Sequence, residues 1–462
     1  MPAILLILAL IILIVLVVMT YRMRIIHTGQ GVEQEKERAA SIQGYIYAAI
    51  VFTSIAVIAC IYWLLKGTVY EAHLMEWLNI VVRVMHITFG IAWIGASFYF
   101  VFLENALNRT EGVRDELAGN LWAVHGGGFY YLEKYKVAPK TIPRHLHWFK
   151  YEAYFTWVSG IGLLFIVYYF NASALLIDNS ILKLSTGEAI AISLGSFIAA
   201  WCMYDLLCKS PLGKRPVLFA VTGVLILIGF AWFYAHVFSG RGAFIHFGAM
   251  IGSIMVANVF FVIIPSQKAM VLGAKKGLPP DPQKGKNALF RSLHNNYFTL
   301  PVLFVMVSNH FPSTFGNKYQ WIVLSAISIG TAGVKHWLNL REKGRLGIWV
   351  LPVSIIILLA TAYVTAPQPV NTKCDEIGFA EVNRIIQTRC VQCHSSKPTD
   401  DFYSAAPNGV VYDTPADIVK KKDLIMQRVV LTKTMPQNNK TNMTPEERET
   451  LRCWIAQGAN MK

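Results

Sequence analysis

The chain has 462 residues, of which 54% are hydrophobic and 15% are charged, and its mean hydropathy is +0.43. A soluble core cannot hide so much apolar surface, so most of the chain is expected to face lipid, which excludes a cytosolic enzyme, a disordered chain and a small disulfide-rich protein. The net charge of +15 would suggest nucleic acid in a soluble protein, but in a membrane protein it first indicates which loops face the cytoplasm.

Ten stretches are apolar enough to cross a membrane as helices, each of which needs roughly 20 apolar residues. The first is interpreted as a retained anchor and not as a signal peptide, because its basic residues, Arg22 and Arg24, follow the apolar run. The eighth is short and is interrupted by Pro301. The predicted spans are residues 2–20, 45–66, 79–103, 152–170, 188–208, 216–238, 242–265, 296–311, 319–338 and 346–366.

The loops between these spans differ in charge. Loops 21–44, 104–150, 209–215, 266–295 and 339–345 contain 23 Lys and Arg, whereas the alternating loops 67–78, 171–187, 239–241 and 312–318 contain 3. Basic loops stay in the cytoplasm, so the first set is predicted to be cytoplasmic. The N-terminus and everything after residue 366 are then periplasmic, in a multi-pass protein of the inner membrane. Topology accounts for the positive charge, and no nucleic-acid partner is expected.

The polar tail, residues 367–462, contains Cys390-Val-Gln-Cys393-His394. C-x-x-C-H is the attachment signature of c-type haem, in which two thiols bind the porphyrin edge and the histidine binds the iron. A redox-active C-x-x-C is the alternative, but the tail lacks the βαβ pattern that accompanies it. Met435 is predicted as the second iron ligand, because it lies in a Met-Pro loop before the last helix, with Met426 and Met443 as competitors.

The end of the tail predicts a final helix, with Thr444 as its cap, Pro445 in its first turn, Glu447 completing a capping box and Gly458 ending it. With a first helix over 377–389, these features predict a small class I cytochrome c domain with His/Met ligation. Cys374 precedes the first helix and Cys453 lies in the last one, and these two helices cross in such domains. A disulfide between them is therefore predicted, which an oxidising compartment permits, with two unpaired thiols as the alternative.

Ionisable residues inside spans are candidates for function. Arg83 and His86 share one helix face, and His236, His246 and His310 lie near the same outer boundary. Three interpretations remain open: His86 and His246 bind a b-type haem between them, Arg83 and the histidines bind an anionic substrate and accept its proton, or all are structural. A second, inner set comprises Glu104, His125, His145, His147, Glu152, Asp205, His294, Lys335 and His336.

The long loop 104–150 contains the run His125-Gly-Gly-Gly-Phe-Tyr130 and the stretch around His147. A glycine run allows close approach of a ligand to the backbone, or forms a turn. His125 and His147 are therefore kept as catalytic candidates.

Several stretches together are similar to the membrane-bound, cytochrome c-linked urate oxidase (urate hydroxylase) family. They are residues 86–100, 125–130, 146–154, 258–265 and 294–301, followed by the C-x-x-C-H domain. The resemblance covers residues 79–462 and implies an eight-helix membrane domain, 79–366, before a periplasmic cytochrome c domain, 367–462. Two additional spans in residues 1–78 depart from the family pattern and suggest assembly with respiratory complexes.

The resemblance implies oxidation of urate to 5-hydroxyisourate, with electrons leaving through haem c to a soluble cytochrome c or a terminal oxidase. Arg83, His86, His246, His125 and His147 are the catalytic candidates from the chemistry above. The alternative function is a non-catalytic, membrane-anchored cytochrome c that carries electrons between respiratory complexes. Reduction of the haem by urate would discriminate between the two.

Overall fold

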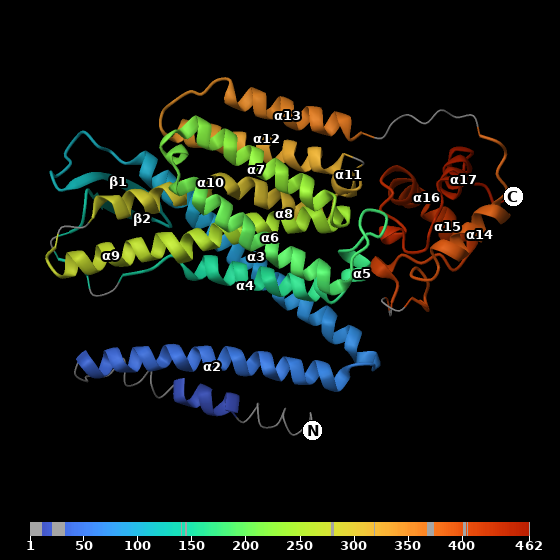
Figure 1. The fold of residues 1–462 in the computed structure, drawn as a ribbon, viewed down its shortest axis with the longest axis horizontal. Helices are drawn as coiled ribbons and strands as arrows, with labels where there is room; N and C mark the ends of the chain where they lie inside the picture. The colour runs from blue at the N-terminus through green and yellow to red at the C-terminus, as the bar shows by residue number, and fades with distance from the viewer. Residues whose placement is uncertain are drawn as a thin grey trace. The chain divides into compact units, whose positions relative to one another are not determined.

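The computed structural model describes residues 12–20, 33–139, 141–143, 146–278, 281–317, 319–366, 374–400, 403 and 405–461. In this part of the chain the structure is helical apart from one β-hairpin, which confirms the all-α prediction (Figure 1). The chain divides into two compact units, Met1–Val81 and Val82–Lys462.

The first unit contains a helix over residues 12–20, helix α2 (Glu33–Leu65) and the start of α3 (Val69–Ala106). Residues 2–11 of the first predicted span lie outside the described residues. Between α2 and α3 the chain turns at Gly67, whose φ of +76° is a left-handed conformation that glycine adopts without strain. Most described side chains of α2 are exposed, as expected for a helix that faces lipid.

Six helical stretches of the described residues are long and apolar enough to cross a membrane: Tyr45–Leu65, His73–Ala106, Tyr151–Tyr169, Thr186–Lys209, Pro216–Ala235 and Gly240–Lys275. They correspond to the second to seventh predicted spans. The tenth, α13 (Val350–Val364), is apolar but only 15 residues long. The eighth and ninth, α10 (Pro282–Ser308) and α12 (Gln320–Glu342), contain buried charged side chains. The count of ten spans therefore stays a prediction.

The helix that contains most of the eighth predicted span extends further toward the N-terminus than the span itself. Helix α10 begins at Pro282, 14 residues before the predicted start at 296, and continues through Pro301. Its first half is polar, so hydropathy alone does not reveal it; Arg291 and Asn295 are buried there with hydrogen-bond partners on other helices.

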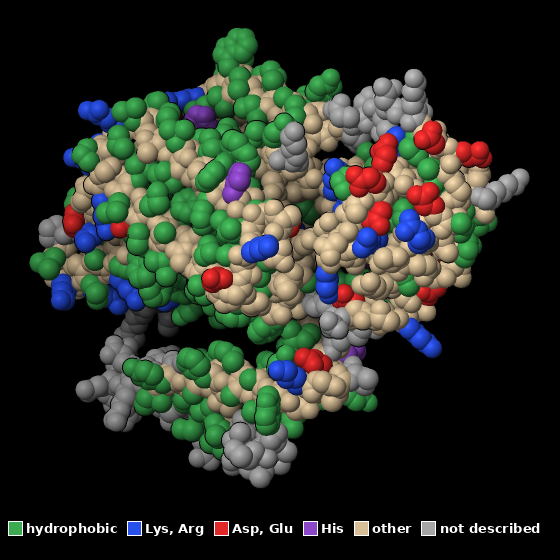
Figure 2. Space-filling view, turned by 45° about the vertical axis from the view of Figure 1, so that its right-hand side comes forward, with side chains coloured by type: hydrophobic (Ala, Val, Ile, Leu, Met, Phe, Trp, Pro, Cys, Tyr) green, Lys and Arg blue, Asp and Glu red, His purple; other side chains and the backbone are tan. Residues whose placement is uncertain are grey.

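The centre of the second unit is α8 (Gly240–Ala257), which contacts α4 (Tyr151–Leu163), α6 (Thr186–Lys209), α7 (Pro216–Ala235) and α10. Most of its residues are buried. Gly248 allows close packing, because a Cβ at this position would lie 2.4 Å from a methyl carbon of Val305 in α10. Hydrophobic side chains cover much of the helical surface, whereas acidic and basic side chains gather over the C-terminal domain (Figure 2).

Three short or irregular elements interrupt the long helices. α4 continues as the π-helix η1 (Leu164–Tyr169) into the short α5 (Ala172–Leu175), and α8 continues as the π-helix η3 (Asn258–Ile263) into α9 (Ile264–Lys275). π-Helical turns are rare and frequent at functional sites. Before the C-terminal domain, this unit also contains the short helices η2 (Pro211–Lys214) and α11 (Pro312–Phe315).

The loop 104–150 forms the antiparallel hairpin β1 (Leu117–His125) and β2 (Gly128–Tyr135), which the sequence did not predict. Gly126 and Gly127 are its turn, with φ of +56° and +79°. Two-residue hairpin turns require such positive φ values, and glycine supplies them. The glycine run is therefore a turn, which was one of its two interpretations.

The C-terminal domain packs α14 (Phe379–Arg389) against α17 (Pro445–Ala456). Thr444 and Glu447 form the predicted capping box of α17. The predicted disulfide between Cys374 and Cys453 is present, with a Cα–Cα distance of 5.5 Å. Between the two helices lie η4 (Pro407–Gly409), α15 (Pro415–Lys420), α16 (Lys422–Ile425), the π-helix η5 (Met426–Leu431) and η6 (Gln437–Asn439).

Candidate functional site

His246 is fully buried in α8, inside a set of aromatic rings. The ring of Phe238 lies 4.7 Å from the imidazole, centroid to centroid. The other four rings are 5.9–6.2 Å away and come from η1, α6 and α7. We call this set the His246 cage: His246, Tyr168, Tyr169, Phe197, Tyr234 and Phe238.

Hydrogen bonds define which ring nitrogen of His246 is available. Nδ1 lies 2.8 Å from the carbonyl oxygen of Gly242, which can only accept, so Nδ1 carries the hydrogen. Nε2 is buried and has no hydrogen-bond partner among the described residues. The hydroxyls of Tyr169 and Tyr234 bond to Ser193 and Ser196. The lone pair of His246 Nε2 is therefore a proton acceptor held in an aromatic environment.

His86 lies on α3 and contacts α4 instead of the cage. Its Nδ1 lies 2.9 Å from the Thr156 carbonyl oxygen and 3.2 Å from Ser159 Oγ. Close packing with Gly160 fixes the ring further, because a Cβ there would lie 3.0 Å from it. Among the described residues, the hydrogen-bond and ring contacts of His86 and His246 have no residue in common. A b-type haem between the two histidines stays a prediction.

The other predicted residues of the outer cluster are arranged differently. Arg83 lies within electrostatic range of Arg241 and of the cage residue Tyr168. His236 and His310 are exposed, and Nδ1 of His236 bonds to the Trp232 carbonyl oxygen at 2.7 Å. The structure thus associates Arg83 with the cage but leaves these two histidines at the surface.

His125 and His147 do not join the cage. His125 is exposed at the end of β1, paired with Gly128 across the hairpin turn. The His147 side chain is 69% exposed, and its Nε2 lies 3.9 Å from a carboxylate oxygen of Glu152. His145 of the same loop lies outside the described residues.

A buried polar network that the sequence analysis identified only in part links α6, η3 and α10. Arg291, 4% exposed, forms an ion pair with Asp205 at 2.5 Å. Asn258 of η3 donates to Asn295 at 2.8 Å, and His294 bonds to the Tyr204 hydroxyl at 2.7 Å. Asp205 and His294 are among the candidates from the sequence, and Asn258 and Asn295 fall within stretches that carry the family resemblance, whereas Arg291 belongs to neither set. The four-residue spacing of 291 and 295, which places both on one helix face, is the signal that could have found them.

Lys335 is also fully buried, and its Nζ lies 3.6 Å from the centroid of the Phe98 ring. Neither this Nζ nor Oδ1 of Asn339, one turn later in α12, has a hydrogen-bond partner among the described residues. Asn339 Nδ2 donates to Asn296 at 3.0 Å. A cation–π contact is thus the interaction that the structure gives the ammonium group.

A cavity in the C-terminal domain brings together all four residues that were predicted to hold haem c. Cys390, Cys393, His394 and Met435 line it, and about 490 Å³ of it is free of atoms, part of this space being open to solvent. Met443, the competitor of Met435, is 3% exposed in the apolar core of the domain and does not line this cavity.

The geometry of His394 suits metal ligation. Nδ1 donates to the carbonyl oxygen of Val410 at 3.0 Å, which leaves the lone pair on Nε2. Burial lowers the pKa of His394, so the imidazole stays neutral, the form that binds a metal. Among the described residues, no group of three or more His, Cys, Asp or Glu is placed so that it could hold a metal ion.

The two cysteines of the motif are free thiols. Burial raises the pKa of Cys390 to about 12 and that of Cys393 to about 11. A redox-active C-x-x-C pair needs the opposite, a lowered pKa that produces a thiolate. The environment of the pair is therefore unlike that of a redox-active C-x-x-C.

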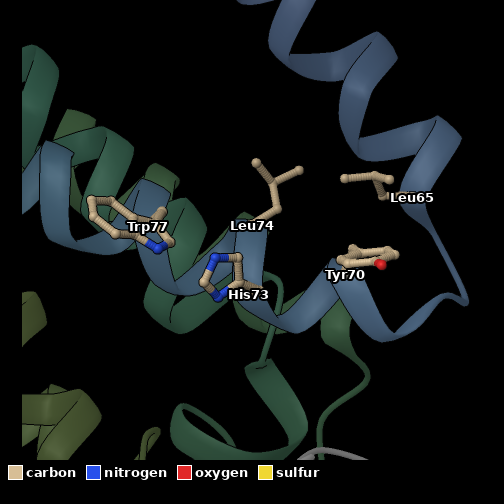
Figure 3. A pocket seen from close by; sticks show the side chains of 5 residues that line it. All are labelled: Leu65, Tyr70, His73, Leu74 and Trp77. Atoms are coloured by element: carbon tan, nitrogen blue, oxygen red, sulfur yellow. The ribbon is translucent and has the colours of Figure 1, made fainter.

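A broad, mostly apolar groove lies in the first unit, at the elbow between α2 and α3 (Figure 3). Leu65 comes from the end of α2 and the other lining residues from the start of α3. None of the predicted site residues lines it. The lining residues are Leu65, Tyr70, His73, Leu74 and Trp77.

Comparison with known proteins identifies the family. The family model described as urate oxidase N-terminal matches residues 72–366, more than half of the chain. No curated protein and no solved structure gives a match. The matched segment includes α4 to α13 and every residue of the His246 cage, so the chain belongs to the urate oxidase N-terminal family.

Proposed function

We propose that this protein is a membrane-bound oxidoreductase that oxidises urate to 5-hydroxyisourate and passes the electrons to a c-type haem in its own C-terminal domain. The observation that carries this proposal is the joining, in one chain, of a urate oxidase N-terminal domain and a cavity lined by Cys390, Cys393, His394 and Met435. Urate and one water give 5-hydroxyisourate, two protons and two electrons. Two successive one-electron steps are therefore needed.

The four cavity residues have distinct proposed roles. Cys390 and Cys393 would form thioethers to the porphyrin, and His394 Nε2 and the Met435 sulfur would ligate the iron. When bound, the haem supplies a one-electron acceptor of raised potential, because methionine ligation favours the reduced state. A soluble cytochrome c or a terminal oxidase would then reoxidise it.

The His246 cage is the proposed urate site. Aromatic rings suit a flat purine, because they stack on its faces without competing for its polar edge. His246 Nε2 would accept a hydrogen bond from a ring N–H of urate and take its proton as electrons leave. Arg83, which lies within electrostatic range of Tyr168 and of Arg241, would attract the urate anion.

The orientation of the protein in the membrane is also part of the proposal. Six apolar helices are compatible with a membrane protein. The loops at one end of the predicted spans contain 23 of the 26 Lys and Arg counted in the loops, so this end would be cytoplasmic. The C-terminal domain would then be periplasmic, the compartment in which both a disulfide and a covalent haem form. Residues 1–78 are proposed to serve assembly with respiratory complexes.

Anaerobic mixing of the purified full-length protein with urate tests the function. We expect reduction of the c-type haem, with two haems reduced per urate consumed, and 5-hydroxyisourate in the product mixture. A pyridine haemochrome spectrum of the same sample should show c-type haem. If ascorbate reduces the haem but urate never does, the chain is an electron-transfer subunit without urate oxidase activity.

A further inference from the structure

The loop that follows Met435 is held against the membrane domain by one side chain. Asn438 has a φ of +48°, a left-handed conformation that asparagine tolerates better than most residues. Its Nδ2 donates to the carbonyl oxygen of Ala174 at 2.8 Å and to that of Ile177 at 2.9 Å. Both hydrogens of the Asn438 side-chain amide therefore form hydrogen bonds to residues 172–177, which we call the α5 turn because they contain α5.

The same turn is fixed on its other side to α8. Ser239, the N-cap of α8, donates from Oγ to the Leu175 carbonyl oxygen at 2.7 Å and from its backbone N–H to Leu176 at 2.8 Å. His246 follows in α8, and Tyr168 and Tyr169 directly precede α5. The α5 turn is thus joined to the His246 cage by backbone continuity on one side and by hydrogen bonds on the other.

Ala174 also lines the C-terminal cavity, together with Met435 and Pro436. One short turn therefore contacts both candidate sites. Covalent bonds and hydrogen bonds through this turn therefore connect the cage to the cavity.

A second contact holds the segment that precedes Met435. A Cβ at Gly316, at the end of α11, would lie 2.5 Å from the Thr432 carbonyl oxygen and 2.7 Å from a side-chain carbon of Thr434. Only glycine permits this approach. We call residues 432–438 the Met435 loop. This loop is therefore in close contact with the membrane domain on both sides of Met435, through Gly316 before it and through Asn438 after it.

We propose that Asn438 and Gly316 dock the Met435 loop on the α5 turn, and that this docked turn is the exit through which electrons leave the membrane domain. The inference rests on the proposed function. In each turnover, two electrons from one urate would cross the α5 turn one at a time, and two protons would be released, the first of them to His246 Nε2. Asn438 is a positioning residue and touches neither substrate nor haem iron.

Asn438→Asp is the sharpest test, because aspartate keeps the shape and the left-handed preference of asparagine but removes both N–H donors. The matched control is Asn442→Asp, an exposed asparagine that follows the Met435 loop and has a φ of +55°. Each full-length variant would be compared by single-turnover haem reduction with urate and with ascorbate, by the haem spectrum, and by hydrogen exchange of peptides covering 172–178 and 432–443.

We expect Asn438→Asp to slow urate-driven haem reduction about tenfold, the effect of losing two neutral hydrogen bonds on a docking equilibrium. Reduction by ascorbate and the haem spectrum should not change, and both peptides should exchange faster. Asn442→Asp should match the unmodified protein in all four measurements. Gly316→Ala should reproduce the Asn438→Asp result, because its new methyl group pushes the 432–434 segment away.

Unchanged hydrogen exchange in both variants would overturn the docking, and faster exchange with an unchanged urate-driven rate would overturn the exit route. Equal slowing with urate and ascorbate would also overturn it, since the defect would then lie in the haem site. If urate does not reduce the haem of the unmodified protein, the proposed function is wrong. Hydrogen exchange would still decide in that case whether Asn438 docks the Met435 loop.

Discussion

His246 donates its Nδ1 hydrogen to the carbonyl oxygen of Gly242, one turn earlier in α8, and thereby keeps the lone pair of Nε2 within the aromatic cage. A histidine that forms a structural bond through each nitrogen could not act as a base. The Nε2 of His246 has no hydrogen-bond partner among the described residues, and the proposed function uses it as a base.

Replacing His246 by glutamine should therefore reduce urate-driven haem reduction by about 10²-fold or more, the usual contribution of a general base. The haem spectrum and the rate of reduction by ascorbate should stay unchanged. His236→Gln is the matched control, because His236 is an exposed histidine at the end of α7. A His246→Gln protein that turns over urate at the normal rate would remove His246 from the mechanism.

Replacing Met435 by alanine should abolish the low-spin His/Met absorption of the haem, because Met435 lines the cavity with His394. Met443→Leu is the control: it conserves volume at a core position, should leave the spectrum intact, and should lower the free energy of unfolding by less than about 1.5 kcal/mol. The opposite pair of spectra would assign the ligand to Met443.

The sequence best predicts the elements whose formation depends on residues that are close together in the chain. Apolar runs mark the helices that are long and apolar enough to cross a membrane. The C-x-x-C-H motif and the Thr444–Glu447 cap are each contained within a few residues. The start of α10 was missed for the converse reason. Arg291 lowers the hydropathy of α10, yet its charge is matched by Asp205 on α6, a partner 86 residues away.

The candidate site was predictable only as a set of residue types. His86 and His246 look alike in the sequence, as histidines near the same boundary of two apolar spans. Their tertiary contacts distinguish them: His86 packs against Thr156 and Gly160, whereas His246 lies among rings from the three helical segments η1, α6 and α7. The π-helical turn that places Tyr168 and Tyr169 beside His246 has no signature in the sequence.

Acid should destabilise the C-terminal domain partly through Glu447. Burial of this carboxylate raises its pKa, but hydrogen bonds from Arg389 and the Thr444 backbone outweigh burial and hold the pKa below its ordinary value. The Arg389 guanidinium lies 3.0 Å from the carboxylate and joins α14 to α17. Because the folded-state pKa is the lower one, the stabilisation is complete above the ordinary pKa and is lost as the pH falls through the lowered value.

Glu447→Gln should therefore lower the free energy of unfolding at neutral pH by about 1–3 kcal/mol, the range for a charge-assisted hydrogen bond. The loss should shrink as the pH falls below the ordinary pKa of glutamate. Glu381→Gln, at an exposed position in the first turn of α14, is the control. Loss of haem absorption during denaturation at several pH values measures the effect, and a difference that grows with acidity would contradict it.

The disulfide between Cys374 and Cys453 should stabilise the C-terminal domain, since it joins residues 79 apart in a domain of limited core. Replacing both cysteines by alanine should lower the free energy of unfolding by about 2–5 kcal/mol, the usual loss for a small domain outside the cytosol. Adding a reductant to the unmodified protein should have the same effect, and should add nothing to the double variant. Cys202→Ala, which removes an exposed free thiol of α6, is the control and should not change the thermal loss of haem absorption. Equal thermal stability of the double variant and the unmodified protein would show that the packing of α14 on α17, and not the bridge, holds the domain together.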